Sequence, residues 1–103
     1  MKRPELIWTA DGEADLRKLY NWMEEHSEQA GDHFIVVVDS ALELLRSFPE
    51  MAPMYEPPFR RLLIGKRDIG LFYAVEGRRI VVHAIAFLNG DSSQIQRRLG
   101  LWS

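Results

Sequence analysis

The sequence predicts a single α+β domain over residues 1–103, in which a helical hairpin packs on a small antiparallel sheet. Three observations predict it. A chain of 103 residues, 47% hydrophobic and 27% charged, has the size and composition of one globular domain. Its first half repeats apolar residues with helical spacing. Its second half holds three apolar segments of strand length, divided by short polar turns. The expected order of elements is β-α-α-β-β-β-α.

The first expected elements are an edge strand and a helix. The apolar run from Leu6 to Trp8 is long enough only for an edge strand. Thr9 or Asp11 can then cap a helix, because their side-chain oxygens accept amides of the first turn. From Gly12 to about His26, apolar side chains recur with helical spacing and form one stripe. This stripe consists of Leu16, Leu19, Tyr20 and Met23, with Trp22 flanking it.

A second helix is expected from about Asp32 to Phe48, after a polar break at residues 27–31. Its β-branched residues between Phe34 and Val38 favour a strand in isolation. The helical period nevertheless continues to Phe48, where Pro49 ends it. The apolar stripe of this helix consists of Phe34, Val37, Val38, Ala41, Leu42, Leu45 and Phe48. Two such helices joined by a short break predict a helical hairpin that covers another layer.

Residues 49–58 contain four of the five prolines and are expected to form a connecting loop. Three strands follow, at residues 59–64, 69–76 and 79–88, and Gly77 lies in the tight turn between the last two. The third of these strands is apolar on both faces, which predicts a central position covered on both sides.

A short C-terminal helix completes the expected fold. Asp91 can cap it, with Gln94 as the reciprocal partner three residues on. Ile95 and Leu99 give the helix a narrow apolar stripe, and Gly100 suits its C-terminal cap.

Several kinds of chemistry are excluded by residues that the sequence lacks. With no cysteine there is no disulfide, thiolate zinc site or cysteine nucleophile, which fits a reducing cytoplasm. The three histidines lack metal-ligand spacing, no serine lies in a Gly-x-Ser-x-Gly turn, and the glycines form no phosphate-binding loop. No apolar run approaches the ~20 residues of a membrane span. We therefore expect a cytoplasmic protein with no metal, no cofactor and no membrane contact.

Charge is distributed unevenly, although the net charge is only −2. Residues 1–50 hold eleven acidic and five basic residues, whereas residues 51–103 hold four acidic and eight basic ones. Six of the basic residues fall on the expected strands or turns, namely Arg60, Arg61, Lys66, Arg67, Arg78 and Arg79. Arginine beside Tyr73 and His83 could hold a phosphodiester and move a proton in metal-free RNA cleavage. The same arginines equally suit docking on an acidic protein surface.

The layout of the chain resembles the RelE/ParE toxin superfamily over roughly residues 5 to 99. The resemblance is carried by Ile7-Trp8-Thr9-x-x-Gly-x-Ala14-Asp15-Leu16, Leu44-x-x-x-Phe48-Pro49, Arg60 or Arg61, Gly70-Leu71-Phe72-Tyr73-Ala74-Val75-Glu76-Gly77 and Ile80-x-Val82-x-x-Ile85. The resemblance implies a bacterial toxin of a type II toxin–antitoxin system, of the kind that acts in plasmid stabilization. It also implies that the toxin forms a hetero-oligomer with a cognate antitoxin. Family members are either ribosome-dependent mRNA endonucleases or ParE-type inhibitors of DNA gyrase.

Two features favour the ParE-like branch, and so a gyrase inhibitor rather than an enzyme. First, the segment from Leu88 to Asp91 lacks the His, Tyr or Arg that the nuclease branch usually carries there. Second, the net charge of the chain is negative, whereas proteins that bind ribosomal RNA are generally basic. The target-binding residues expected on this hypothesis are Arg60, Arg61, Lys66, Arg67 and Trp102. Two alternatives stay open. One is a RelE-like nuclease acting on the ribosome and mRNA through Arg61, Tyr73 and His83, and the other is a non-toxic family member that only binds a partner.

Overall fold

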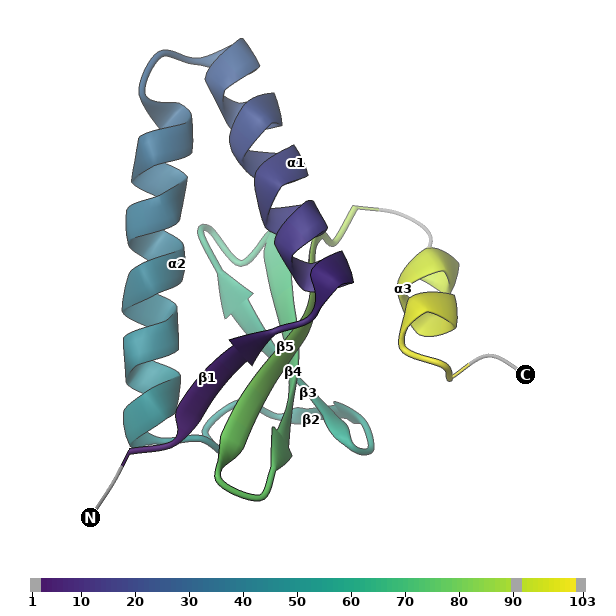
Figure 1. The fold of residues 1–103 in the computed structure, drawn as a ribbon. Helices are drawn as coiled ribbons and strands as arrows, with labels where there is room; N and C mark the ends of the chain where they lie inside the picture. Colours follow the sequence, from purple (N-terminus) through teal and green to yellow (C-terminus); the bar gives the residue numbers. More distant parts are fainter. Residues whose placement is uncertain (1–2, 90–91, 102–103) are drawn as a thin grey trace.

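The computed structural model describes residues 3–89 and 92–101 and shows two helices on one face of a five-stranded sheet and a third helix on the other (Figure 1). The order of strands across the sheet is β1-β5-β4-β3-β2. In chain order the elements are β1 (Glu5–Trp8), α1 (Ala10–His26), α2 (Ala30–Ser47), β2 (Met54–Glu56), β3 (Phe59–Ile64), β4 (Ile69–Glu76), β5 (Arg79–Phe87) and α3 (Ser93–Arg98).

The predicted helical hairpin is confirmed, with both helices beginning two residues earlier than expected. Thr9 caps α1, since its hydroxyl accepts the amide of Gly12 at 3.0 Å. Gly12 also permits a close approach, because a Cβ there would lie 2.7 Å from the carbonyl oxygen of Val82. The start of α1 therefore rests directly on β5. The hairpin residues buried in the core are Leu19, Phe34, Val38, Leu42 and Leu45, whereas Leu16, Tyr20 and Met23 are half-buried.

The sheet differs from the predicted one in two ways. First, it is mixed, because β1 pairs in parallel with the first four residues of β5, from Arg79 to Val82. Second, the predicted loop at residues 49–58 contains β2, which pairs antiparallel with β3 through Met54 and Arg60. Prolines on both sides of β2 do not prevent this pairing, because β2 lies at the sheet edge, where a missing N–H is tolerated.

The expected central position of the last strand is confirmed, and the strand also contains an irregularity. β5 lies between β1 and β4. Phe72 of β4 pairs with Ala84, but the next residue, Tyr73, pairs with Val82, so His83 is an extra residue in β5. This β-bulge reverses the alternation of side chains along the strand. Val82 before it and Ile85 after it consequently both face the helical hairpin.

Side chains from both faces of the sheet form hydrophobic cores. The larger core lies under the helical hairpin and includes Leu71 and Tyr73 of β4. The smaller core lies on the opposite face, where Leu99 follows α3 and packs with Phe59 and Phe72. The predicted cap of α3, Asp91, lies outside the described residues. At the other end of α3, Gly100 takes φ 75° and completes the expected C-terminal cap.

Candidate functional site

Tyr73 of the nuclease hypothesis lies inside the larger core. Its side chain is 0% exposed, and its hydroxyl donates a hydrogen bond to the carbonyl oxygen of Pro49 at 2.8 Å. Burial raises the pKa of Tyr73, because it penalises the charged phenolate. A neutral phenol enclosed in this way cannot touch a substrate. Tyr73 connects the end of α2 to the sheet.

Arg60 lies directly across from Tyr73 in the β3–β4 ladder and also has structural contacts. Its Nη1 donates to the carbonyl oxygens of Glu50 at 3.1 Å and Ala52 at 2.8 Å, and its Nη2 lies 3.7 Å from the Glu50 carboxylate. These contacts hold the segment after α2 against the sheet. Arg60 was expected to contact a target, but its guanidinium is largely engaged within the protein.

Arg61 and His83 lie on the opposite face of the sheet from Tyr73. The guanidinium of Arg61 lies 5.3 Å from the centre of the Tyr55 ring. The His83 ring packs edge-on against Phe59, with centroids 5.1 Å apart, and its Nε2 lies 3.4 Å from a carboxylate oxygen of Glu76. The three nuclease candidates are therefore not brought together, because the sheet separates Tyr73 from the other two.

The remaining predicted target-binding residues lie at one end of the sheet or beyond the described chain. Lys66 and Arg67 are exposed in the turn between β3 and β4, where Arg67 takes φ 69°. The Lys66 amide donates to the carboxylate of Asp68 at 3.3 Å, which helps to fix the turn. Trp102 lies outside the described residues.

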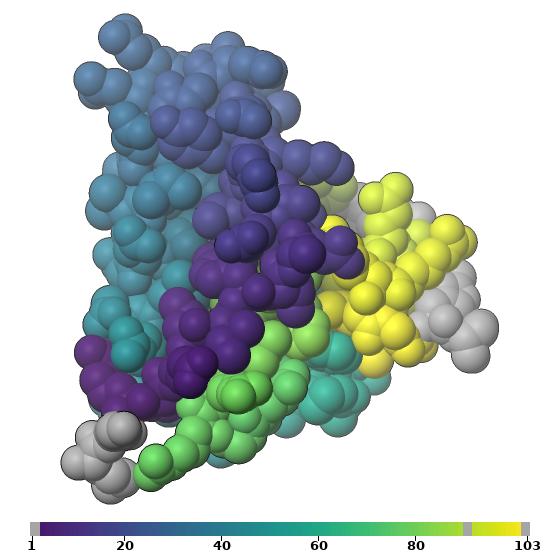
Figure 2. All heavy atoms as spheres, viewed as in Figure 1, coloured from purple at the N-terminus to yellow at the C-terminus, as the bar shows by residue number. Residues whose placement is uncertain are grey.

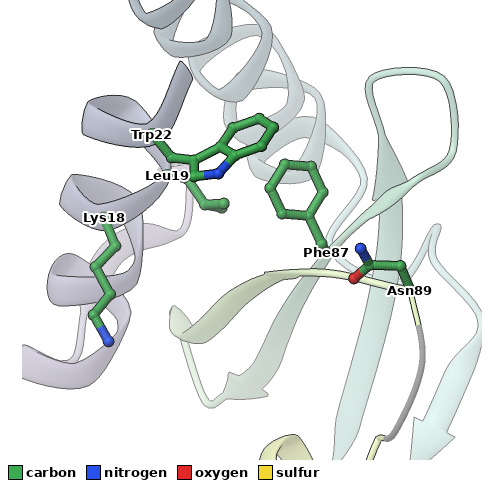
Figure 3. Close-up of a pocket in the computed structure, with 5 residues that line it drawn as sticks. All are labelled: Lys18, Leu19, Trp22, Phe87 and Asn89. Atoms are coloured by element: carbon green, nitrogen blue, oxygen red, sulfur yellow. The ribbon is translucent and has the colours of Figure 1, made fainter. Parts of the chain in front are cut away.

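A groove between α1 and the end of β5 was not predicted from the sequence. It is lined by Lys18, Leu19 and Trp22 of α1 and by Phe87 and Asn89 (Figure 3). Trp22 is 45% exposed, stacks on His26 with ring centroids 3.9 Å apart, and meets Phe87 edge-on at 5.2 Å. One feature of the sequence pointed to this groove, namely a tryptophan beside the apolar stripe of the helix. The sequence did not indicate that Trp22 contacts Phe87.

A second pocket adjoins this groove and shares Lys18 and Phe87 with it, where α3 stands beside the start of α1 (Figure 2). An ion pair between Asp15 and Arg98 lies in its wall. The guanidinium of Arg98 binds both oxygens of the Asp15 carboxylate, at 2.7 and 2.9 Å. This hydrogen bonding raises the pKa of Arg98. One oxygen of Asp15 also accepts the Ile85 amide at 3.1 Å. Asp15 thus connects α1, β5 and α3.

Residues 3–89 and 92–101 contain no cluster of three or more His, Asp or Glu side chains that could hold a metal ion. None of the helices they form is long and apolar enough to cross a membrane.

Comparison with known proteins adds two findings. The family model for the ParE toxin of the type II toxin–antitoxin system parDE matches residues 6–92. Among solved structures, a chain of the chromosomal ParDE TA system from P. aeruginosa has the same fold, with a TM-score of 0.73 and 18% sequence identity over 84% of this chain and 98% of that one. No curated protein sequence matches. Because the family model covers most of the sequence, the chain belongs to the ParE toxin family of type II toxin–antitoxin systems.

Proposed function

We propose that this protein inhibits DNA gyrase by binding to it, and that a cognate antitoxin neutralises it in the bacterial cytoplasm. Membership of the ParE toxin family supports the toxin–antitoxin part. One observation favours gyrase over mRNA as the target. The Tyr73 side chain is enclosed in the larger core, on the opposite side of the sheet from Arg61 and His83.

Metal-free RNA cleavage needs a proton carrier and cations that converge on one phosphate. Here Tyr73 is enclosed, and Arg60 is bonded to backbone carbonyls. His83 is half-buried, with its Nε2 near Glu76. Inhibition by protein binding makes no such demand, since it needs only an accessible surface of suitable charge.

The target-binding surface that we propose consists of Lys66, Arg67 and Arg61. The first two are exposed in one turn, and Arg61 lies on the adjoining strand β3. Arg60 is left out, because reversing its charge would disrupt the contacts that hold residues 50–52. Trp102 stays in the proposal as a C-terminal aromatic contact.

The experiment is a gyrase supercoiling assay with purified protein. We expect inhibition, and we expect the double variant Lys66→Glu/Arg67→Glu to need about tenfold more protein, which corresponds to about 1.4 kcal/mol of binding. The control is Arg78→Glu/Arg79→Glu, which makes the same change of charge in exposed residues at the opposite end of β4 and β5. This control and His83→Gln should inhibit like the wild type.

A parallel assay on translating ribosomes tests the alternatives. Codon-dependent mRNA cutting that is lost in His83→Gln would replace this proposal with the nuclease. A protein that neither inhibits gyrase nor cuts mRNA, yet binds its partner, would be the non-toxic family member.

A further inference from the structure

A further pocket lies on the face of the sheet opposite the helical hairpin, between the sheet and α3. Its volume is about 170 Å³, and most of the side chains that line it are aromatic or aliphatic. Among the described residues that line it, Arg61 is the only charged one. We call it the Arg61 pocket, and its principal lining residues are Tyr55, Arg61, Phe72, Leu88, Asn89 and Ile95.

Contacts within the protein hold the walls of the Arg61 pocket in place. The Tyr55 ring meets Phe72 edge-on, with ring centroids 5.1 Å apart, and its hydroxyl lies 3.5 Å from the side-chain nitrogen of Gln96 on α3. Gly70 leaves room for the floor of the pocket, because a Cβ there would lie 3.1 Å from Phe72 and 3.3 Å from the Arg61 side chain. The pocket is therefore formed in the isolated chain, which lowers the ordering cost of binding.

The Arg61 guanidinium has no acidic partner in the described part of the chain. It lies 5.3 Å from the centre of the Tyr55 ring, and none of the ion pairs within residues 3–89 and 92–101 includes it. The Arg61 side chain is half-buried, so water screens its charge less than on an open surface. A carboxylate that enters the pocket can accept two parallel hydrogen bonds from such a guanidinium.

The pocket adjoins the basic turn of the proposed target-binding surface. Leu88 lines the pocket, and its amide donates to the carbonyl of Asp68 at 2.9 Å. Asp68 directly follows Lys66 and Arg67, which are both exposed. Two further cations therefore lie at the same end of the sheet as the pocket, and the combined charge favours an acidic partner.

The size of the pocket limits what can occupy it. A volume of about 170 Å³ is below the ~300–1,000 Å³ that is usual for small-molecule sites. It also cannot admit an α-helix, which is about 10–12 Å wide with its side chains. The pocket has room for one inserted side chain.

We propose that an acidic side chain of DNA gyrase inserts into the Arg61 pocket. Its carboxylate binds the Arg61 guanidinium, and its methylene groups pack on Tyr55 and Ile95, which are both half-buried. This inference rests on the proposed inhibition of gyrase, and it names the chemistry by which the target is recognised.

Binding of the purified chain to DNA gyrase tests this inference. It is measured without DNA and without the antitoxin, the expected product of the neighbouring gene. We expect Arg61→Gln to raise the Kd at least thirtyfold, because it leaves the inserted carboxylate without its partner. The matched control is Arg79→Gln, which removes the same charge from an exposed residue at the other end of the sheet. The control should bind within twofold of the wild type.

A second variant fills the pocket without changing its charge. Ile95→Phe places a larger side chain in the wall that α3 forms, and we expect the Kd to rise about tenfold. The matched control is Leu44→Phe, a similar enlargement at an exposed position of α2, which should bind like the wild type. Thermal melting verifies that each variant folds.

The outcomes separate this inference from the proposed function. A wild-type chain that does not bind gyrase would overturn both. Gyrase binding in which Arg61→Gln matches Arg79→Gln, or Ile95→Phe matches Leu44→Phe, would overturn the pocket and leave gyrase inhibition standing.

Two other occupants have their own results, and either result would overturn the acidic side chain of gyrase. An effect of Arg61→Gln that appears only when gyrase holds DNA would identify a phosphate group as the occupant. Dimers of the free chain that both Arg61→Gln and Ile95→Phe abolish in sedimentation would identify a second copy.

Discussion

Tyr73 shows how one hydroxyl group can connect two layers of this protein. It reaches from the middle of the sheet to the carbonyl of Pro49, the residue that follows the C-cap of α2. On the same face, Arg60 holds the next carbonyls of that segment. Tyr73, a candidate of the nuclease hypothesis, and Arg60, an expected target-binding residue, therefore both fix the path of the chain from α2 into the sheet.

Replacing Tyr73 by Phe should lower the free energy of unfolding by about 1–2 kcal/mol, because the Pro49 carbonyl loses its donor. Gyrase inhibition should be unchanged at temperatures where the variant is folded. The raised pKa of Tyr73 adds a pH dependence: the folded state holds the phenol proton more tightly, so stability falls as the pH rises above the unfolded pKa of about 10. Tyr73→Phe should lack this contribution to the loss of stability at alkaline pH, which urea denaturation at several pH values measures. Lost inhibition without lost stability would instead assign Tyr73 to target binding.

At the scale of the element, α2 offers a direct test of how the hairpin packs. Leu42 is 6% exposed and Leu44 is 45% exposed on the same helix. Leu42→Ala should therefore lower the free energy of unfolding by about 2–5 kcal/mol, since it leaves a cavity against the sheet. Leu44→Ala, with the same loss of atoms and the same helix propensity, should cost at most about 0.5 kcal/mol. Equal losses in urea denaturation would contradict the orientation of α2 on the sheet.

The elements differ in how far their sequence could predict them. The helices follow from a period that each helix carries within itself. The parallel pairing of β1 with β5 depends on a partner far away in the sequence, which a local pattern does not reveal. β2 pairs with the adjacent strand β3, but its three residues lie between prolines and are too few to show a strand period. The bulge at His83 is hidden for another reason: β5 is apolar on both faces, so reversing the alternation leaves the pattern unchanged.

The same limit applies to the candidate site. Strand alternation predicts that Arg60 and Arg61 face opposite sides, but not which side the hairpin covers. Trp22 beside the stripe of α1 was visible in the sequence, whereas its contact with Phe87 requires the fold.

At the scale of the whole molecule, several large apolar side chains are exposed to solvent, and packing within the isolated chain does not account for them. The large hydrophobic residues exposed in the described part are Trp22, Val36, Leu44, Phe48, Met51 and Met54. Trp22 lies on α1, and Val36 and Leu44 lie on α2. The other three lie in the segment from the C-cap of α2 to the first residue of β2. Phe48 and Met51 lie together beside Val75 at one pocket, and Trp22 lies beside Phe87 at another. Contiguous exposed apolar surface marks sites of protein association. The folded chain is thus expected to be more stable with a partner than alone.

Binding of the proposed antitoxin should raise the melting temperature of the chain in proportion to the logarithm of the partner concentration. A partner that binds only the folded state at one hundred times its Kd adds about 2.7 kcal/mol, which for a chain of this size corresponds to a shift of ~10–20 °C. The measurement is thermal unfolding of the chain with increasing amounts of the neighbouring gene product. An unrelated acidic protein serves as the control for charge alone, and it should leave the melting temperature unchanged. A melting temperature that stays constant while the two proteins elute together would mean that the partner binds the folded and unfolded chains equally, and that recognition does not depend on the fold.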